Sequence, residues 1–257
     1  MQRRVSRARL DQVMVERGLA ESRAKAQALV LAGQVFSGEQ RLDKPGRPVP
    51  PDLPIEVRAS AVPYVSRGGV KLAHALDRFD VDPAGRAALD VGASTGGFTD
   101  VLLRRGASRV YAVDVGHGQL AWRLRNDPRV VVLEKVNARR LSRQHVPEPV
   151  DLVACDVSFI SLELALPPAL ALAGPDASLI ALIKPQFEVG KGQVGKGGVV
   201  RDPALHQAVC ARITNWLAEQ QGWHVRGVIE SPITGPKGNR EFLIAATRPE
   251  PLPSQMS

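Results

Sequence analysis

Cysteine is scarce in this chain, and its scarcity excludes two common ways of stabilising a protein. Cys155 and Cys210 are the only two cysteines among 257 residues. Two thiols are too few for a disulfide framework or a zinc cluster, so we expect neither bridges nor a metal site. Their scarcity fits a reducing compartment, which predicts a cytoplasmic protein.

Long apolar runs are missing as well. The first ten residues are basic and no apolar segment follows them, so we expect no secretory signal. The stretch that comes nearest to a membrane span, residues 164–183, is interrupted by prolines, by Gly174 and by Asp176. We therefore expect no membrane association, and we interpret this stretch as a helix, a turn and a buried strand.

Negative charge is in deficit. The chain has 34 Lys and Arg against 26 Asp and Glu, a net charge of +8, while 44% of its residues are hydrophobic. This composition is that of a globular protein with one good core and room for a small second domain. The positive excess favours a polyanionic partner, for which nucleic acid is the leading candidate, although charge alone indicates only non-specific affinity.

A glycine-rich turn organises the larger part of the chain. Residues 87–91 form a short apolar strand pattern, and residues 98–105 have the apolar spacing of a helix. Glycines between a strand and a helix let a ligand approach the backbone, and the free N–H groups of the helix face that ligand. We predict a cofactor site here, with a turn that binds nothing as the alternative. The predicted contacts are Asp90, Gly92, Ser94, Gly96, Gly97 and Phe98.

Three polar residues indicate which cofactor this turn binds. Ser94 stands where the dinucleotide fingerprint GxGxxG has its middle glycine, which counts against NAD because that glycine admits a pyrophosphate. Asp90 ends the strand and suits a cationic amino-acid group. Asp114 ends the next strand pattern and can accept hydrogen bonds from ribose hydroxyls. S-adenosylmethionine fits both carboxylates and is the predicted cofactor.

Strand and helix patterns alternate after the turn, which predicts an α/β class with a Rossmann-like, doubly wound parallel sheet. The predicted strands are 110–114, 130–133, 152–156 and 179–183, followed by an antiparallel pair at 223–229 and 241–247. The predicted helices are one before the first strand, from Val70 to Phe79, and others at 118–125, 162–172 and 203–221. A small α+β domain precedes them, giving domains at 1–60 and 67–257 with a linker at 61–66.

The first 60 residues have a pattern of their own. Four arginines, at 3, 4, 7 and 9, precede a helix that begins at Leu10 and ends at Gly18. Ser22 is placed to cap a second helix, which ends at Gly33, and two short strands flank a proline-rich turn. Arg9, Arg23 and Lys25 would present their charges to RNA phosphates, with a solvated basic face as the alternative.

This first segment resembles the S-four RNA-binding domain, named for a small-subunit ribosomal protein. The resemblance rests on five short motifs, which are RLD at 9–11, RGLA at 17–20, SR at 22–23, GQV at 33–35 and KP at 44–45. It spans nearly all of residues 7–58 and implies an RNA-binding function for them.

Strand ends also suggest where the chemistry lies, because ligands of an open α/β sheet bind beyond the carboxyl ends of its strands. Asp156 and Lys184 end neighbouring strand patterns. The turn Asp156-Val-Ser-Phe lacks the prolines typical of enzymes that methylate base amines. Cys155 faces away from Asp156 in a strand, which disfavours a cysteine nucleophile. A hydroxyl acceptor remains, and it needs a base.

A lysine can be that base once its pKa is lowered, and Lys184 is the candidate. For Lys184 alone, a solvated side chain is an equal alternative. The sequence also offers a second lysine, Lys71, and a second carboxylate, Glu241.

Seven motifs together resemble the TlyA (hemolysin A) ribosomal RNA methyltransferases, whose catalytic domain is FtsJ-like. They are SRGGVKL at 66–72, the glycine turn at 90–99, DVG at 114–116, NAR at 137–139, DVSFIS at 156–161, KPQFE at 184–188 and GNRE at 238–241. The resemblance implies a catalytic tetrad of Lys71, Asp156, Lys184 and Glu241, and cofactor contacts near Asp90, Gly92, Asp114 and Asn137. It further implies 2′-O-methylation of cytidine in the ribosomal RNA of ribosomal subunits.

Other interpretations stay open at this point. A membrane-active haemolysin is disfavoured because no span or membrane helix is predicted, and an RNA-binding protein without activity is disfavoured because all four tetrad positions are present. Residues 190–197 fit GxxxxGK but have Gly197 where a P-loop needs Ser or Thr. We interpret them as a basic loop over the substrate, or as a plain surface loop. Tyr64 replaces a tryptophan of some relatives.

Overall fold

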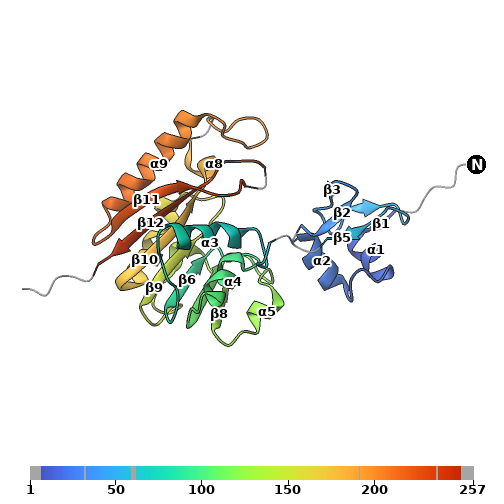
Figure 1. Cartoon of the computed structure of the whole chain (residues 1–257), viewed down its shortest axis with the longest axis horizontal. Helices are drawn as coiled ribbons and strands as arrows, with labels where there is room; N and C mark the ends of the chain where they lie inside the picture. Colours follow the sequence, from blue (N-terminus) through green and yellow to red (C-terminus); the bar gives the residue numbers. More distant parts are fainter. Residues whose placement is uncertain (1–6, 32, 59–61, 191, 236, 250–257) are drawn as a thin grey trace, which may run out of the picture. The chain divides into compact units, whose positions relative to one another are not determined.

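A computed structural model describes residues 7–31, 33–58, 62–190, 192–235 and 237–249. The chain divides into two compact units, Met1–Pro63 and Tyr64–Ser257 (Figure 1). Arg3 and Arg4 of the predicted N-terminal arginine cluster lie outside the described residues. Each unit has its own apolar core, so each is described separately.

The first unit packs two helices against short strands. Helices α1 (Leu10–Glu16) and α2 (Arg23–Leu31) lie at the two predicted places, and Ser22 Oγ caps α2 by accepting a hydrogen bond from Lys25 N at 3.2 Å. Strand β2 (Val35–Ser37) pairs with β3 (Gln40–Arg41) and β5 (Glu56–Val57), and β1 (Ala8–Arg9) pairs with β4 (Pro48–Val49). Their shared core contains Leu10, Val13, Met14, Val30, Val35 and Val49.

The second unit is built on a seven-stranded sheet with the order β11-β12-β10-β9-β6-β7-β8. Its parallel strands are β6 (Ala87–Val91), β7 (Arg109–Asp114), β8 (Val130–Glu134), β9 (Val150–Cys155) and β10 (Ala173–Ile183). Strand β12 (Phe242–Arg248) runs antiparallel to β10 and to β11 (His224–Glu230). The predicted doubly wound sheet with a terminal antiparallel pair is confirmed.

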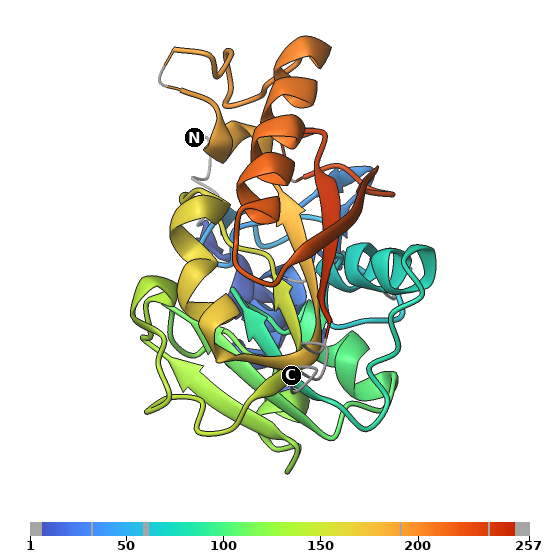
Figure 2. The same cartoon turned by 90° about the vertical axis from the view of Figure 1, so that its left-hand side faces the viewer.

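Helices cover both faces of this sheet (Figure 2). Helices α3 (Gly68–Arg78) and α4 (Gly97–Arg104) pack on one face, where the core includes Leu152 and Ala154 of β9. Helices α6 (Leu162–Ala165), α7 (Pro167–Leu172) and α9 (Pro203–Ala218) pack on the other, with Val153 and Cys155. Successive side chains of a strand point to opposite faces, so a strand buried on both faces must be apolar throughout.

Three predicted elements have other boundaries in the structure than the sequence indicated. The single helix expected at 162–172 breaks into α6 and α7, because Pro167 has no N–H to continue the first helix. The helix expected at 118–125 shortens to α5 (Trp122–Arg125), since Gly118 adopts a left-handed backbone with φ of 69°. The turn expected at Gly174–Asp176 is an irregularity inside β10, which begins at Ala173.

Two short elements were not predicted, α8 (Pro185–Glu188) and the 3₁₀ helix η1 (Ala138–Arg140). Both follow the carboxyl end of a strand, β10 and β8 respectively. Within the described part of the chain, no helix combines the length and apolar character that crossing a membrane requires.

Candidate active site

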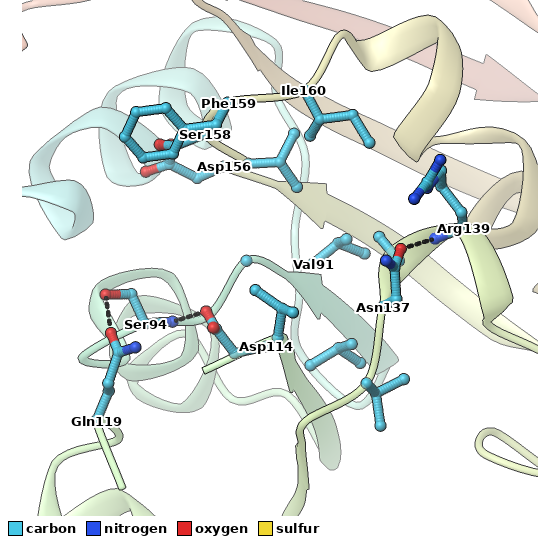
Figure 3. Close-up of a pocket in the computed structure, with 16 residues that line it drawn as sticks. Val91, Ser94, Asp114, Gln119, Asn137, Arg139, Asp156, Ser158, Phe159 and Ile160 are labelled. Atoms are coloured by element: carbon cyan, nitrogen blue, oxygen red, sulfur yellow. Dashed lines mark hydrogen bonds between the residues drawn. The ribbon is translucent and has the colours of Figure 1, made fainter. Parts of the chain in front are cut away.

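A cavity of about 450 Å³ opens beyond the carboxyl ends of β6, β7, β8 and β9 (Figure 3). Five of the residues predicted for the site line it, namely Gly92, Ser94, Asp114, Asn137 and Asp156. Its wall also contains residues that were not among the predicted site residues, namely Gln119, Arg139, Ser158, Phe159 and Ile160 with several apolar neighbours. A volume of this size suits a nucleoside-sized ligand.

The turn after β6 forms one wall of the cavity. Gly92 has a left-handed φ of 87°, and a Cβ at this position would lie 2.6 Å from the carbonyl oxygen of Asp156. Only glycine therefore lets the end of β6 approach the end of β9 so closely. Ser94 also has a left-handed backbone, with φ of 48°, although it carries a side chain. This strained conformation turns its N–H toward Asp114.

Asp114 holds the turn with both of its oxygens. Oδ2 accepts a hydrogen bond from Ser94 N at 2.8 Å, and Oδ1 accepts one from Gly116 N at 2.6 Å. Gln119 completes this wall, because its Oε1 accepts a hydrogen bond from Ser94 Oγ at 3.2 Å (Figure 3). Gln119 was missed because the sequence predicted a helix at 118–125, whereas Gln119 lies in the irregular segment before α5.

Three of the predicted cofactor contacts lie behind the cavity wall. A Cβ on Gly96 would approach Leu124 Cδ1 to 2.3 Å, and one on Gly97 would approach Ser66 Oγ to 2.2 Å. Phe98 is 3% exposed and belongs to the core between α3, α4 and the sheet. These residues shape the turn by packing tightly against neighbouring elements and do not line the cavity, so their role as cofactor contacts stays a prediction.

Asp90 also lies behind the wall, and its carboxyl group is completely buried. Oδ2 accepts a hydrogen bond from Thr99 Oγ1 at 2.6 Å, whereas Oδ1 is buried without a hydrogen-bond partner in the described part of the chain. Burial raises the pKa of Asp90 to about 7, and the nearby carboxylates of Asp156 and Asp114 act in the same direction. The group is therefore poised between its neutral and ionised forms.

Asp90 should make stability depend on pH. Its pKa is about 7 in the folded chain against 3.8 for the ordinary group, so folding favours the protonated form. Its contribution is complete below pH 4 and is lost as pH rises to 7, at about 1.4 kcal/mol per unit. We expect Asp90→Asn, which mimics the neutral form, to be more stable than the parent chain at pH 8 and similar to it at pH 4.

Urea unfolding followed by tryptophan fluorescence from pH 4 to 9 measures this difference. Glu219→Gln removes an exposed carboxylate from the same unit and serves as the matched control. Stability curves of the parent chain and Asp90→Asn that run parallel across this range would contradict the prediction.

Strand alternation brings the other predicted polar residues to one face of the sheet. Asp156 follows Cys155, and Lys184 follows Ile183, whose side chains both point toward α6, α7 and α9. The next residue in each case points to the opposite face, which α3 covers. Strand register pairs Ile183 with Phe242, so Lys184 and Glu241 are the next opposed residues beyond the ladder. Lys71 lies on α3 itself.

These four residues form two ion pairs. Lys184 Nζ lies 2.5 Å from Asp156 Oδ1, a close ionic contact that is not aligned as a hydrogen bond, and it donates a hydrogen bond to Ser158 Oγ at 2.8 Å. Lys71 Nζ donates to Glu241 Oε2 at 2.5 Å. Lys71, Lys184 and Glu241 are only 7%, 8% and 1% exposed. Charges this deeply buried are strongly unfavourable without such partners.

Several side-chain contacts join the segment that follows Asp156 to the segment that follows Lys184. The rings of Phe159 and Phe187 lie 4.8 Å apart, and the buried carboxylate of Glu188 accepts hydrogen bonds from Ser161 Oγ at 2.7 Å and Leu162 N at 2.9 Å. Arg212 of α9 binds the same carboxylate at 3.0 Å. Burial raises the pKa of Glu188, with these donors opposing the shift. The DVSFIS and KPQFE motifs thus form one rigid support for Lys184.

Phe159 is the most exposed large apolar residue of the described chain, at 88%. It lines the cavity beside Ser158, and its backbone has a left-handed φ of 66° (Figure 3). A non-glycine residue in this conformation is strained by roughly 1–3 kcal/mol. The local fold therefore holds an aromatic ring in solvent at the entrance of the site.

The glycine-rich loop at 190–197 does not open a helix. A β-bridge joins Gly195 of the loop to Val199, which follows it, and α9 begins only at Pro203. Asn239 anchors the loop base, since its Oδ1 accepts from Val200 N at 3.0 Å and its Nδ2 donates to Gly198 O at 2.9 Å. A P-loop would need a helix at this point. Lys191 lies outside the described residues.

The predicted RNA-contacting residues lie in the first unit. Arg9 and Arg23 share the carboxylate of Asp11 as a partner, and Lys25 is exposed in the first turn of α2. No local sequence pattern indicates that Asp11 links the two arginines, because the three residues belong to β1, α1 and α2.

Comparison with known proteins agrees with both units. The FtsJ-like methyltransferase family matches residues 64–248, and the S4 domain matches residues 8–55. The chain is 51% identical to "16S/23S rRNA (cytidine-2'-O)-methyltransferase TlyA" of Mycobacterium tuberculosis, over 93% of this chain and 89% of that protein. It is 49% identical to "Putative rRNA methyltransferase YqxC" of Bacillus subtilis, over 92% and 84%.

A solved structure is similar over almost the whole length. It is a putative hemolysin from Streptococcus thermophilus, with a TM-score of 0.73 and 38% identity, covering 97% of this chain and 93% of that one. The family match spans well over half of the chain and includes every strand of the seven-stranded sheet. The chain therefore belongs to the FtsJ-like methyltransferase family and carries an S4 domain before its methyltransferase unit.

Proposed function

We propose that this protein is an S-adenosylmethionine-dependent 2′-O-methyltransferase that acts on cytidine ribose in ribosomal RNA. The observation that carries the proposal is the pair of buried lysine–carboxylate contacts, Lys184 with Asp156 and Lys71 with Glu241, at the edge of the sheet where the cavity opens. Two relatives whose names state or suggest rRNA methylation, at about half identity, support the substrate class.

The cavity suits the cofactor chemically. Asp114 could accept hydrogen bonds from ribose hydroxyls through lone pairs that its two backbone donors leave free. Asn137 and the apolar residues Val115, Val136 and Ile160 could enclose an adenine ring. The buried Oδ1 of Asp90 has no partner in the described chain and suits a cationic amino group nearby. When bound, S-adenosylmethionine supplies a methyl group on a positively charged sulfur.

The protein's own residues would then prepare the acceptor. Lys184 Nζ, in its neutral form, accepts the proton of the ribose 2′-hydroxyl as the oxygen becomes methylated. Asp156 and Ser158 hold Nζ in place from two sides. The Lys71–Glu241 pair lies on the same face and orients the hydroxyl and Lys184. Reaction at a hydroxyl rather than a base amine is supported by the turn after Asp156, which lacks prolines.

Two further features support a nucleic acid acceptor. Phe159 offers an exposed ring at the cavity entrance, and RNA bases turned out of a helix stack on such rings. The S4 domain adds basic side chains on a separate unit. We propose that this unit binds ribosomal RNA within ribosomal subunits. A membrane-active function would give no role to the cavity or to the two buried ion pairs.

Transfer of labelled methyl groups tests the proposal. Purified protein is incubated with labelled S-adenosylmethionine and with each ribosomal subunit from cells that lack the enzyme. Nuclease digestion and mass spectrometry then locate the label. We expect it on the 2′-oxygen of cytidine, and label on a base ring would overturn the proposed reaction.

Calorimetry tests the cofactor separately. We expect the protein to bind S-adenosylmethionine and neither ATP nor NAD, because Ser94 and the carboxylate of Asp114 occupy the wall where a diphosphate would need backbone access. Asp114→Asn should weaken S-adenosylmethionine binding about 10-fold, through loss of a charge-assisted hydrogen bond. Binding of ATP with equal or higher affinity would instead favour a nucleotide site.

A further inference from the structure

Asp11 is a buried carboxylate on the unit proposed to bind RNA. It lies in the first turn of α1, its side chain is 0% exposed, and it contacts three side chains from two other elements. Its oxygens accept hydrogen bonds from Arg9 Nε at 3.0 Å, Arg9 Nη2 at 2.8 Å and Gln27 Nε2 at 2.8 Å. Arg23 Nη2 approaches Oδ2 at 3.5 Å. Two arginines and one amide thus converge on a single carboxylate.

Both arginines keep an exposed side. The side chains of Arg9 and Arg23 are 49% and 57% exposed, although one end of each guanidinium group contacts Asp11. Arg9 has five N–H donors and uses those of Nε and Nη2 on the carboxylate, which leaves Nη1 for another acceptor. Gly46 lies against this group, since a Cβ there would be 3.0 Å from Nη1. The guanidinium group is therefore held along one edge by Asp11, and the space beside it leaves little room for a side chain at position 46.

A carboxylate group is unexpected on a surface that is proposed to bind the phosphates of RNA. Its hydrogen bond with Arg9 holds the pKa of Asp11 far below its usual range, so the group stays ionised. By charge alone, this negative group repels phosphate and cancels part of the arginines' attraction. The carboxylate also orders the two arginine side chains before RNA binds, so less conformational entropy is lost on binding. The remaining N–H donors of the arginines are then held in a fixed orientation.

We propose that Asp11 is a positioning residue that holds the guanidinium groups of Arg9 and Arg23 ready to bind a phosphate of the RNA backbone. The proposal rests on the proposed RNA-binding function and adds the residue that organises the contact. Both Nη2 atoms contact the same oxygen, Oδ2 of Asp11, so this one carboxylate holds the two guanidinium groups beside each other.

The sign of one substitution separates positioning from charge. Asp11→Asn removes a negative charge, so electrostatic attraction alone predicts tighter RNA binding. Positioning predicts the opposite, because the amide no longer fixes both guanidinium groups. We expect RNA affinity to fall about 3- to 10-fold for each arginine released, the usual cost of ordering a long side chain on binding. Glu21→Gln removes an exposed carboxylate one residue before the Ser22 cap and should leave affinity unchanged or slightly raised.

The experiment measures binding of the full chain to purified, labelled ribosomal RNA by filter binding, at several concentrations of KCl. Asp11→Asn is also made in a chain that carries Arg9→Gln and Arg23→Gln. There it should cause no further loss, because no arginine remains to be positioned. A further loss in that background, or tighter binding of Asp11→Asn alone, would overturn the positioning role. Wild-type affinity of the Arg9→Gln, Arg23→Gln chain would instead overturn the proposed RNA-binding function of this unit.

A second variant covers the case in which Asp11→Asn lowers the melting temperature of the first unit. Gly46→Ala keeps every charge, and its Cβ would lie 3.0 Å from Arg9 Nη1, so the guanidinium group has to shift by a few tenths of an ångström relative to Asp11. We expect weaker RNA binding with unchanged affinity for S-adenosylmethionine. Unchanged RNA binding by Gly46→Ala would show that the orientation of Arg9 does not matter, and would also contradict the proposal.

Discussion

Replacement of Lys184 by alanine is expected to lower the rate of methyl transfer by roughly 10²–10⁴-fold, the usual contribution of a positioned acid or base. The side chain is 8% exposed, and its Nζ is held between Asp156 Oδ1 at 2.5 Å and Ser158 Oγ at 2.8 Å. Cofactor affinity should change little, because Lys184 is not among the residues that line the cavity, and the fold should persist because the Asp156 side chain is 20% exposed and keeps contact with solvent. Single-turnover transfer of labelled methyl groups to ribosomal subunits measures the effect.

The variant Lys184→Arg distinguishes a role of Lys184 as a general base from a role as a positive charge. Arginine keeps the positive charge and can still pair with Asp156, but its guanidinium group stays protonated and cannot accept a proton. We therefore expect this variant to be almost as inactive as Lys184→Ala. An arginine variant with near-normal single-turnover rates would show that Lys184 orients the substrate by charge. Cofactor affinity and the melting temperature of each variant are the controls.

The fold was largely predictable because it depends on patterns that are local in sequence. Strands buried on both faces must be continuously apolar, and runs such as Leu152–Cys155 are therefore visible without a structure. Their alternation with helical patterns then leaves a doubly wound sheet as the simplest arrangement. Errors occurred where a single residue decides the backbone, as Pro167 does between α6 and α7 and Gly118 does before α5.

The interior of the candidate site was less predictable, because its contacts join distant residues. Lys71 and Glu241 are 170 positions apart, and no local pattern indicates that their side chains form a pair. The glycines of the turn illustrate the same limit. Gly92 and Gly96 both have left-handed backbones, yet one lines the cavity and the other packs under Leu120 and Leu124. Sequence indicates that a glycine is required, whereas packing decides what approaches it.

The buried Lys71–Glu241 ion pair has two alternative explanations, a contribution to stability or a contribution to activity. The side chain of Glu241 is 1% exposed and that of Lys71 is 9% exposed, so both ions have lost most of their hydration. Buried ion pairs of this kind often contribute little net stability, because desolvation offsets their attraction. Breaking such a pair is nevertheless costly, since the remaining charge is then buried alone. If the pair is retained for catalysis, an apolar replacement should preserve the fold and lose the activity.

Three variants test this expectation. Glu241→Leu leaves the ammonium group of Lys71 without its partner and should destabilise the second unit by roughly 3–5 kcal/mol. Lys71→Met leaves the carboxylate of Glu241 without its partner and should lower stability by a similar amount. The double variant buries neither charge, so its free energy of unfolding should return close to that of the parent chain. Urea unfolding measures these values. We expect methyl transfer by the refolded double variant to stay at least 10²-fold below normal. A double variant that is both stable and active would assign the pair to packing, whereas a double variant as unstable as the single ones would show that the pair itself stabilises the fold.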